Sequence, residues 1–235
     1  MSGGIGPTAS DIRLAKEEEV EQKSQKQSTR RGFLSFRQLN ALAVIIVFSA
    51  SGMVSIEDLA FAFFTLIYVF FLSKFAFPLL GPYPDPPVFG QTNKILSLYV
   101  SLAAVIGLLL PIAYIFEGIL EGDKEGIKAA APHVFLLSSQ VFVEGLTFSL
   151  GFSLPIRAFV PVFYNSMRMF TLLDWLKAEI GKAGEGSGGS IRRVYFGRAL
   201  AVANLGLWSF NLFGFLLPVY LPRCLKKYYG YKEKV

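Results

Sequence analysis

The chain has 235 residues, of which 53% are hydrophobic and only 17% are charged, and its formal net charge is +6. A soluble domain usually carries about 25% charged residues, so this composition argues against an ordinary soluble domain. The basic residues gather beside apolar runs, where they set orientation and meet anionic headgroups. We therefore expect no nucleic-acid partner.

The organisation of the chain follows from where the polar residues lie. Residues 1–31 have almost no apolar side chain to bury, so we expect a disordered polar tail. Residues 32–222 predict one helical membrane domain, and residues 223–235 predict a basic C-terminal tail.

Long apolar runs follow one another through the predicted membrane domain. The run 95–116 has no charged side chain and is long enough to cover a hydrocarbon core of roughly 30 Å as a helix. In lipid the backbone must bond to itself, so such a run predicts a membrane-spanning helix. Similar runs cover residues 39–54, 59–77, 132–151 and 197–221.

Short polar stretches separate these runs. Ser55 and Asp58 have the spacing of a weak capping box at the start of the second run. The proline-rich stretch Pro78–Pro87 favours a stiff loop, and the Gly/Ser-rich stretch 181–190 predicts a flexible linker.

One stretch, 154–180, fits two descriptions. Arg157, Asn165 and Arg168 lie on one side of a helix there, opposite an apolar side. The helix either lies in the interface plane or spans with its polar stripe facing other helices. Two arginines and a proline make a poor span. We therefore predict an all-α polytopic membrane protein with five transmembrane helices plus an amphipathic interfacial helix, and the alternative is six transmembrane helices.

The flanking charges predict the orientation of the first run. Arg30, Arg31 and Arg37 precede or flank it, whereas the turn after it offers only Glu57 and Asp58. The positive-inside rule therefore predicts a cytoplasmic N-terminus, in an endomembrane or the plasma membrane. Five spans would place the C-terminus on the opposite side and six would return it to the cytoplasm. Counts of basic residues favour five only slightly, and the basic tail favours six.

Several polar side chains fall inside the apolar runs. The candidate intramembrane polar site consists of Glu144, Gln140, His133, Arg157, Arg168, Asn204 and Asn211. Glu144 is near the middle of its run, where an ionisable group is costly. It either lines a polar cavity for protons or substrate, or is neutral or paired with Arg157 or Arg168 and holds helices together.

The sequence offers no recognisable catalytic or metal-binding pattern. It contains one histidine and one cysteine, so a metal site of the usual kind is not expected, and neither is a cofactor. No serine, cysteine or carboxylate pair has a recognisable base partner nearby. These features predict a non-enzymatic protein.

Three segments resemble an uncharacterised family of plant multi-pass transmembrane proteins. They are RRGFLSFRQLNALAVIIVFSASGMVS (30–55), PHVFLLSSQVFVEGLTFSL (132–150) and RAFVPVFYNSMRMFTLLDWL (157–176). The family is defined only as a domain of unknown function. The resemblance therefore implies plant origin and a multi-pass topology, without implying an activity or any site residue.

Two functional classes remain open from the sequence. The first is a multi-pass membrane protein that acts by association with lipids, with other membrane proteins or with a second copy of itself. The alternative is a small transporter or channel subunit with a polar intramembrane site around Glu144. Convergence of Glu144, an arginine and Asn211 on one cavity would favour the second.

Overall fold

The computed structural model describes residues 46, 51–81, 88, 94–182 and 190–232. The tail 1–31, most of the run 39–54, and most of the predicted loop and linker lie outside the described residues. The chain divides into two units, Met1–Ala41 and Leu42–Val235. All that follows concerns the second unit.

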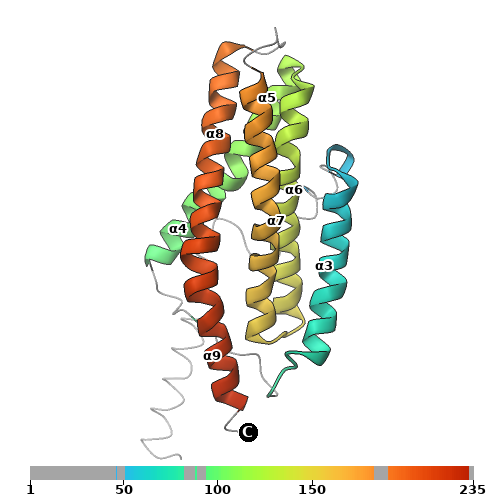
Figure 1. Cartoon of the computed structure of the whole chain (residues 1–235), viewed down its shortest axis with the longest axis vertical. Coiled ribbons are helices and arrows are strands. Elements are labelled where there is room, and N and C mark those ends of the chain that lie inside the picture. Colours follow the sequence, from blue (N-terminus) through green and yellow to red (C-terminus); the bar gives the residue numbers. More distant parts are fainter. Residues whose placement is uncertain (1–45, 47–50, 82–87, 89–93, 183–189, 233–235) are drawn as a thin grey trace, which may run out of the picture. The chain divides into compact units, whose positions relative to one another are not determined.

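Every regular element in these described ranges is a helix, as the sequence predicts (Figure 1). The elements are η1 (Ser51–Met53), α3 (Ile56–Phe75), α4 (Lys94–Ala104), η2 (Val105–Leu109), α5 (Leu110–Glu121), α6 (Lys124–Ser149), α7 (Leu154–Gly181), α8 (Ile191–Ser209), η3 (Phe210–Tyr220) and α9 (Leu221–Lys232). Three helices are long and apolar enough to cross a membrane: Ile56–Phe75, Lys94–Glu121 and Ile191–Lys232.

Local signals fix where these helices begin and end. The Ser55 hydroxyl accepts a hydrogen bond from the Asp58 amide at 3.2 Å, which confirms the predicted cap of α3. Helix α5 ends at Gly122, whose φ of 74° lies in the left-handed region that favours glycine. Asp123 then caps α6 by accepting from the Gly126 amide at 2.9 Å. The predicted basic tail is helical through Lys232.

The long helix from Lys94 to Glu121 is interrupted by a π-helical turn, η2. The Leu110 amide bonds to the Val105 carbonyl, and Pro111 has no amide to donate. The carbonyls of Ile106 and Gly107 are therefore left without their helical partners. Side chains from two other helices satisfy both of them, as described below.

Helices α6 and α7 form the centre of the bundle (Figure 1). A short turn joins them, so they run antiparallel side by side, with α8 packed on α7 and α3 packed on both α6 and α7. One core cluster joins α5, α6, α7 and α8. Its buried members are Tyr114, Ala130, Leu137, Leu172, Trp175, Leu200, Ala201 and Trp208.

The stretch 154–180 forms the single long helix α7, and its polar side faces its neighbours. Tyr164, Asn165 and Arg168 are fully buried. A helix lying in the interface plane would expose such a stripe to headgroups and water. The stripe therefore contacts other helices of the bundle in the described residues.

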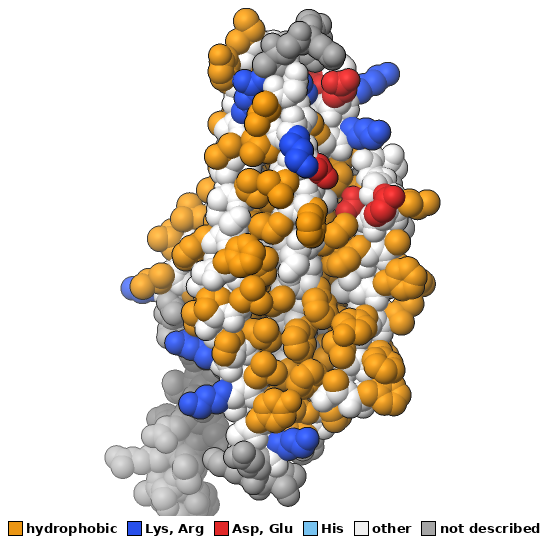
Figure 2. All heavy atoms as spheres, in the orientation of Figure 1, with side chains coloured by type: hydrophobic (Ala, Val, Ile, Leu, Met, Phe, Trp, Pro, Cys, Tyr) orange, Lys and Arg blue, Asp and Glu red, His pale blue; other side chains and the backbone are white. Residues whose placement is uncertain are grey.

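Apolar side chains also cover much of the outside of the bundle. On the face shown in Figure 2 they gather over α3, α7 and α8, while aspartates and glutamates appear only toward the end where α7 finishes and α8 begins. Large exposed apolar surface of this extent fits contact with lipid.

Candidate functional site

Arg168 is the centre of a polar network inside the bundle. Its guanidinium donates to Gln140 Oε1 at 2.5 Å and to Asn165 Oδ1 at 3.1 Å. It also lies over the ring of Trp208, 4.2 Å from the ring centre. Two neutral amides and an aromatic face thus hold a buried cation, and no carboxylate contacts it directly in the described part of the chain.

Glu144 joins this network through Gln140. The Gln140 amide donates to Glu144 Oε1 at 2.7 Å, while its carbonyl accepts from Arg168. An amide therefore lies between Glu144 and Arg168, for which the sequence left a direct pair open. Glu144 itself is half-buried.

The side chains of His133 and Asn204 contact the two backbone carbonyls that the interrupted helix leaves without helical partners. His133 Nε2 lies 2.8 Å from the Gly107 carbonyl, and Asn204 Nδ2 donates to the Ile106 carbonyl at 3.0 Å. Asn204 Oδ1 accepts in turn from Trp208 Nε1 at 3.2 Å. These two predicted site residues therefore stabilise a helix–helix contact.

The two remaining predicted site residues have other neighbours. Arg157 lies near the start of α7, with its guanidinium 4.7 Å from the ring centre of Phe148. Asn211 Oδ1 accepts from the Tyr99 hydroxyl at 2.8 Å. Neither has a direct contact with Arg168 or Glu144 among those described. The two pockets described below are not lined by any of these four residues.

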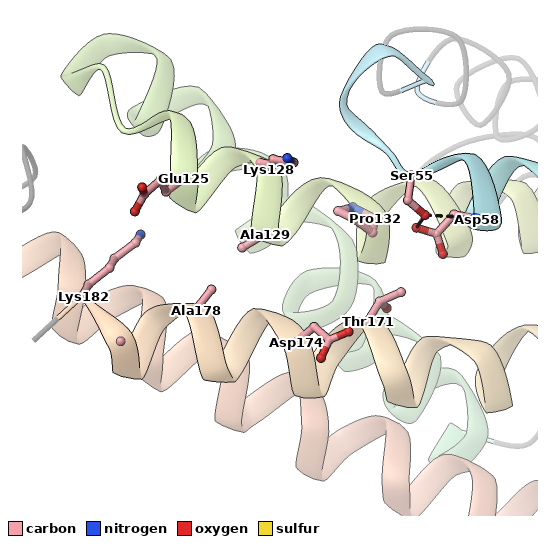
Figure 3. A pocket seen from close by; sticks show the side chains of 11 residues that line it. Ser55, Asp58, Glu125, Lys128, Ala129, Pro132, Thr171, Asp174, Ala178 and Lys182 are labelled. Carbon is pink, nitrogen blue, oxygen red and sulfur yellow. Dashed lines mark hydrogen bonds between the residues drawn. The ribbon is translucent and has the colours of Figure 1, made fainter.

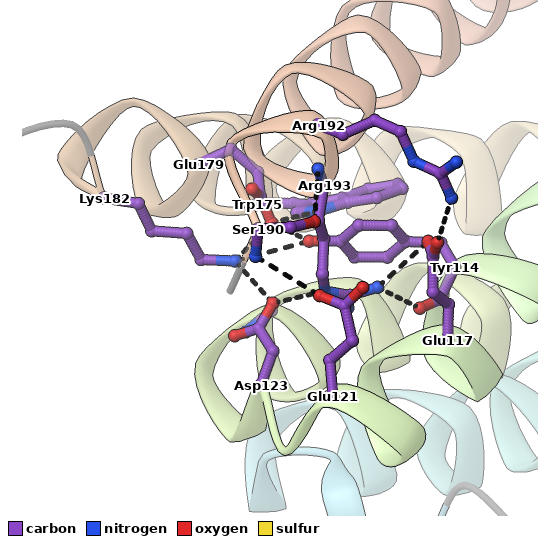
Figure 4. Close-up of polar contacts among 11 residues, drawn as sticks. Tyr114, Glu117, Glu121, Asp123, Trp175, Glu179, Lys182, Ser190, Arg192 and Arg193 are labelled. Carbon is purple, nitrogen blue, oxygen red and sulfur yellow. Dashed lines mark hydrogen bonds and ion pairs between the residues drawn. The ribbon is translucent and has the colours of Figure 1, made fainter. Parts of the chain in front are cut away.

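A second polar cluster occupies the end of the bundle where α5, α6, α7 and α8 meet (Figure 4). We call it the polar cap, defined by Tyr114, Asp123, Glu179, Lys182 and Arg193. Arg193 Nε donates to Asp123 Oδ2 at 2.8 Å, and its guanidinium lies 4.0 Å from the ring centre of Tyr114. Arg193 is only 1% exposed.

Lys182 completes the ion pairs of the polar cap. Its ammonium lies 3.0 Å from Asp123 Oδ2 and 3.0 Å from Glu179 Oε1. Glu179 Oε1 also accepts from the Tyr114 hydroxyl at 2.5 Å and from Trp175 Nε1 at 3.3 Å. Two cations and two carboxylates are thus buried together with no net charge.

Glycines make room for the polar cap. A Cβ on Gly197 would lie 2.6 Å from Glu179 Oε2 and 2.8 Å from the Tyr114 hydroxyl. Cβ atoms on Gly118 and Gly126 would likewise collide with side chains of the cap. Three different helices, α5, α6 and α8, therefore approach the charged groups through glycine.

The surroundings of Asp123 favour its charged form. Burial raises the pKa of the Asp123 carboxyl. Hydrogen bonds from the Gly126 amide, Arg193 and Lys182 lower it by more, so the pKa lies below its usual value. Asp123 is therefore stabilised as a carboxylate by its direct contacts with the two cations of the polar cap. We found no group of three or more potential metal ligands among the described residues.

A polar pocket lies beside the cap, between α6 and α7, and reaches the start of α3 (Figure 3). Its volume is about 640 Å³. Ser55 and Asp58 lie at one end, and Lys182 and Glu125 lie at the other (Figure 3).

A second, apolar groove lies between α3 and α7. It has a volume of about 680 Å³. Its lining consists of Phe61, Phe64, Thr65, Ile67, Tyr68, Phe71, Phe163, Ser166, Met167 and Phe170. Nearly all of these side chains are aromatic or aliphatic, which suits a hydrocarbon ligand.

A protein-family model matches residues 34–229 and is described as a domain of unknown function, DUF7733. The chain belongs to this family. No curated protein matches the chain, and no solved structure matches it. The family assignment agrees with the resemblance to an uncharacterised family.

The sequence indicated the Arg168 network and missed the polar cap. Charged residues stand out within apolar runs, whereas Asp123, Lys182 and Arg193 lie in polar segments that predict loops. One available signal was the set of glycines in otherwise helical stretches, because an isolated glycine inside a helix often marks close packing.

Proposed function

We propose that this protein crosses the membrane six times, with α7 as one of the crossings. Ser55 lines the same pocket as Pro132 and Thr171, so the start of α3 is level with those two residues. At the other end, the Ser153 hydroxyl donates to the Phe77 carbonyl at 2.7 Å. From Ser153 to Thr171 a helix rises about 27 Å, close to the thickness of a hydrocarbon core.

The Arg168 network then lies within the bilayer and the polar cap lies outside it. The remaining crossings are α3, the continuous helices Lys94–Glu121 and Ile191–Lys232, α6, and the first apolar run, most of which lies outside the described residues. An even number of crossings places both termini on one side and the cap on the other.

The charges favour cytoplasmic termini. Near the cap, acidic and basic residues are mixed and paired, as in the Arg193–Asp123 and Lys182–Glu179 pairs. At the opposite end basic residues predominate: Lys74, Arg157, Arg223, Lys226, Lys227 and Lys232. By the positive-inside rule, that basic end faces the cytoplasm.

With this topology, the protein acts by association with membrane lipids. The observation that carries this proposal is the apolar groove between α3 and α7. Its residues Phe61 to Phe71 lie within the first five turns of α3, the depth at which acyl chains pack. A groove of this kind at this depth is suited to a hydrocarbon chain.

A bulky side chain placed in the groove tests the proposal. Ser166 lines the groove, is exposed, and donates its hydroxyl to the Val162 carbonyl. Ser166→Trp should displace a bound chain and lower the number of lipids that co-purify in native mass spectrometry. Ser101, an exposed serine of α4 with the same type of backbone bond, supplies the matched control Ser101→Trp. Equal lipid retention by both variants would contradict lipid binding in the groove.

Other associations belong to the same class of function. The exposed apolar side chains of α3 and α8 are also suited to contact with another membrane protein or a second copy of the chain. We propose no catalytic role, cofactor or nucleic-acid partner.

A transporter or channel subunit is the second candidate, because one observation favours it. The chain Arg168–Gln140–Glu144 leads from a fully buried cation to a half-buried carboxylate. Charged groups in membrane helices often mark a substrate path. Liposome flux that disappears in Glu144→Gln while the folded protein remains would support this candidate over simple lipid association.

A further inference from the structure

Asp58 is a buried carboxylate that no cation of the described residues neutralises. It is 4% exposed, and its Oδ2 accepts from the Ser55 hydroxyl at 3.0 Å. It also lines the polar pocket together with Asp174 (Figure 3). Burying an ionised carboxylate costs free energy unless a partner compensates it, and this one lines an open cavity.

The polar pocket and the apolar groove follow one another along the same two helices. On α3, Asp58 of the pocket lies one turn before Phe61 of the groove. On α7, Phe170 of the groove lies one turn before Asp174 of the pocket. Asp58 and Asp174 are therefore adjacent to the apolar groove. Lys128 and Lys182 also line the pocket, with Lys182 at the end opposite to Asp58 (Figure 3).

We propose that these two features form one site for a long-chain base, a single-chain amphiphile with a protonated amine and hydroxyl groups at the head of its chain. This inference rests on the proposed lipid association and assigns the chemical class of the ligand. The chain occupies the groove, the ammonium contacts Asp58 and Asp174, and the hydroxyls reach Ser55 and Thr171. An ammonium supplies three donors, which suits two carboxylates that only accept.

The order of the apolar groove and the two carboxylates along the helices excludes other common lipids as the ligand. In a glycerophospholipid a phosphate lies between the chains and any amine, so its negative charge would face the two aspartates first. A fatty acid would bring its carboxylate to the same place. An amine attached directly at the end of the chain is the arrangement that matches an apolar groove followed at once by two carboxylates.

A simpler role for Asp58 is stabilisation of the start of α3. It lies in the first helical turn, where a carboxylate interacts favourably with the helix dipole. The neighbouring Glu57 shares that position but is exposed and is not among the residues that line the polar pocket. Glu57→Gln therefore removes the same charge from the helix terminus without altering the pocket, which makes it the matched control for Asp58→Asn.

The test uses the full chain in detergent or nanodiscs, with sphinganine as the probe and with ceramide and palmitate as uncharged and anionic comparisons. We expect sphinganine to raise the thermal midpoint more than either comparison. Asp58→Asn should weaken sphinganine binding about tenfold or more, because it removes a charged hydrogen-bond acceptor. Glu57→Gln should leave it unchanged. Asp174→Asn, at a side chain that is 73% exposed and already pairs with the exposed Lys177, should weaken it less.

The outcomes separate this inference from the proposed function. If Ser166→Trp displaces lipid but neither aspartate variant changes sphinganine binding, the headgroup assignment is wrong and lipid association stands. If Ser166→Trp retains all lipid, the proposed function fails as well. Equal stabilisation by sphinganine and ceramide would also overturn the assignment, since ceramide has no ammonium.

Discussion

Two buried polar regions of this molecule stabilise their buried cations in different ways. In the polar cap, Arg193 and Lys182 contact the carboxylates of Asp123 and Glu179 directly. In the network within the bundle, Arg168 contacts only the neutral side chains of Gln140 and Asn165 and the ring of Trp208. The cap contains balanced charges, whereas the network contains a cation held by dipoles.

The difference predicts how each region responds to the loss of one member. Removing one ion of a directly paired, buried cluster leaves an opposite charge without compensation, which is costly. Removing Arg168 leaves its direct partners, which are neutral, short of a hydrogen bond, and Glu144 keeps its bond from Gln140. The cap should therefore be the more sensitive of the two regions.

The largest effect is expected from Arg193→Met. Among the described residues, this change leaves Asp123 with Lys182 as its only cationic partner, and it should lower the free energy of unfolding by roughly 3–5 kcal/mol. Thermal or denaturant unfolding in detergent measures the loss. The adjacent Arg192 is 85% exposed at its side chain and pairs with the partly exposed Glu117, so Arg192→Met should change stability by less than about 1 kcal/mol. Similar losses in the two variants would contradict the buried cluster.

A smaller effect is expected from Gly197→Ala. The new methyl group would overlap Glu179 Oε2 and the Tyr114 hydroxyl, and we expect a loss of about 1–3 kcal/mol. Gly206 lies on the same helix, and a Cβ added there would have no atom within 4 Å, so Gly206→Ala should stabilise by about 0.5–1 kcal/mol. Opposite signs in the two unfolding experiments would support the cap geometry, whereas stabilisation by both substitutions would count against it.

The network should show weak coupling between its two charges. Glu144 and Arg168 meet through Gln140, so a double-mutant cycle of Glu144→Gln and Arg168→Gln should give a coupling below about 1 kcal/mol. The readout is thermal stability in nanodiscs. A coupling of about 3 kcal/mol or more, on the order of a buried ion pair, would mean that the two side chains contact each other directly.

The smallest effect concerns the pH dependence of stability. The pKa of Asp123 is lower in the folded protein than its ordinary value, so its stabilising contribution is complete above about pH 4 and is lost as the pH falls through the folded pKa. Asp123→Asn should therefore flatten the acid limb of a stability curve below about pH 4. An unchanged acid limb would show that Asp123 is not the carboxylate responsible.

The sequence predicted the helical class and pointed to the charged residues of the Arg168 network. The same reasoning could not identify the polar cap. Arg168 and Glu144 are conspicuous because charges are rare in apolar runs, and the structure brings both to Gln140. The mediating role of Gln140 depends on side-chain geometry that helix periodicity does not contain. The cap could not be predicted, because residues as distant as Tyr114 and Arg193 meet only when four helices pack.

The sequence-based prediction that 154–180 lies at the membrane interface depends in the same way on packing that the sequence does not contain. Its composition, with Arg157, Pro161 and Arg168, is poor for a helix that faces lipid. Packing removes that objection to spanning, since Pro161 and Arg168 are buried between neighbouring helices. Average hydropathy describes a lipid-facing helix well and a helix at the centre of a bundle poorly.

The central proposal is that α7 crosses the membrane, which places the Arg168 network inside the bilayer, the polar cap outside it and the groove at acyl-chain depth. Topology mapping tests this crossing most directly. Glycosylation acceptor sites or protease-accessible tags would be placed at the N-terminus, within 183–189 and at the C-terminus of the full chain. We predict that the two termini lie on the same side of the membrane and that the tag within 183–189 lies on the other. An N-terminal tag and a 183–189 tag on the same side would show that α7 does not cross, and would contradict the account.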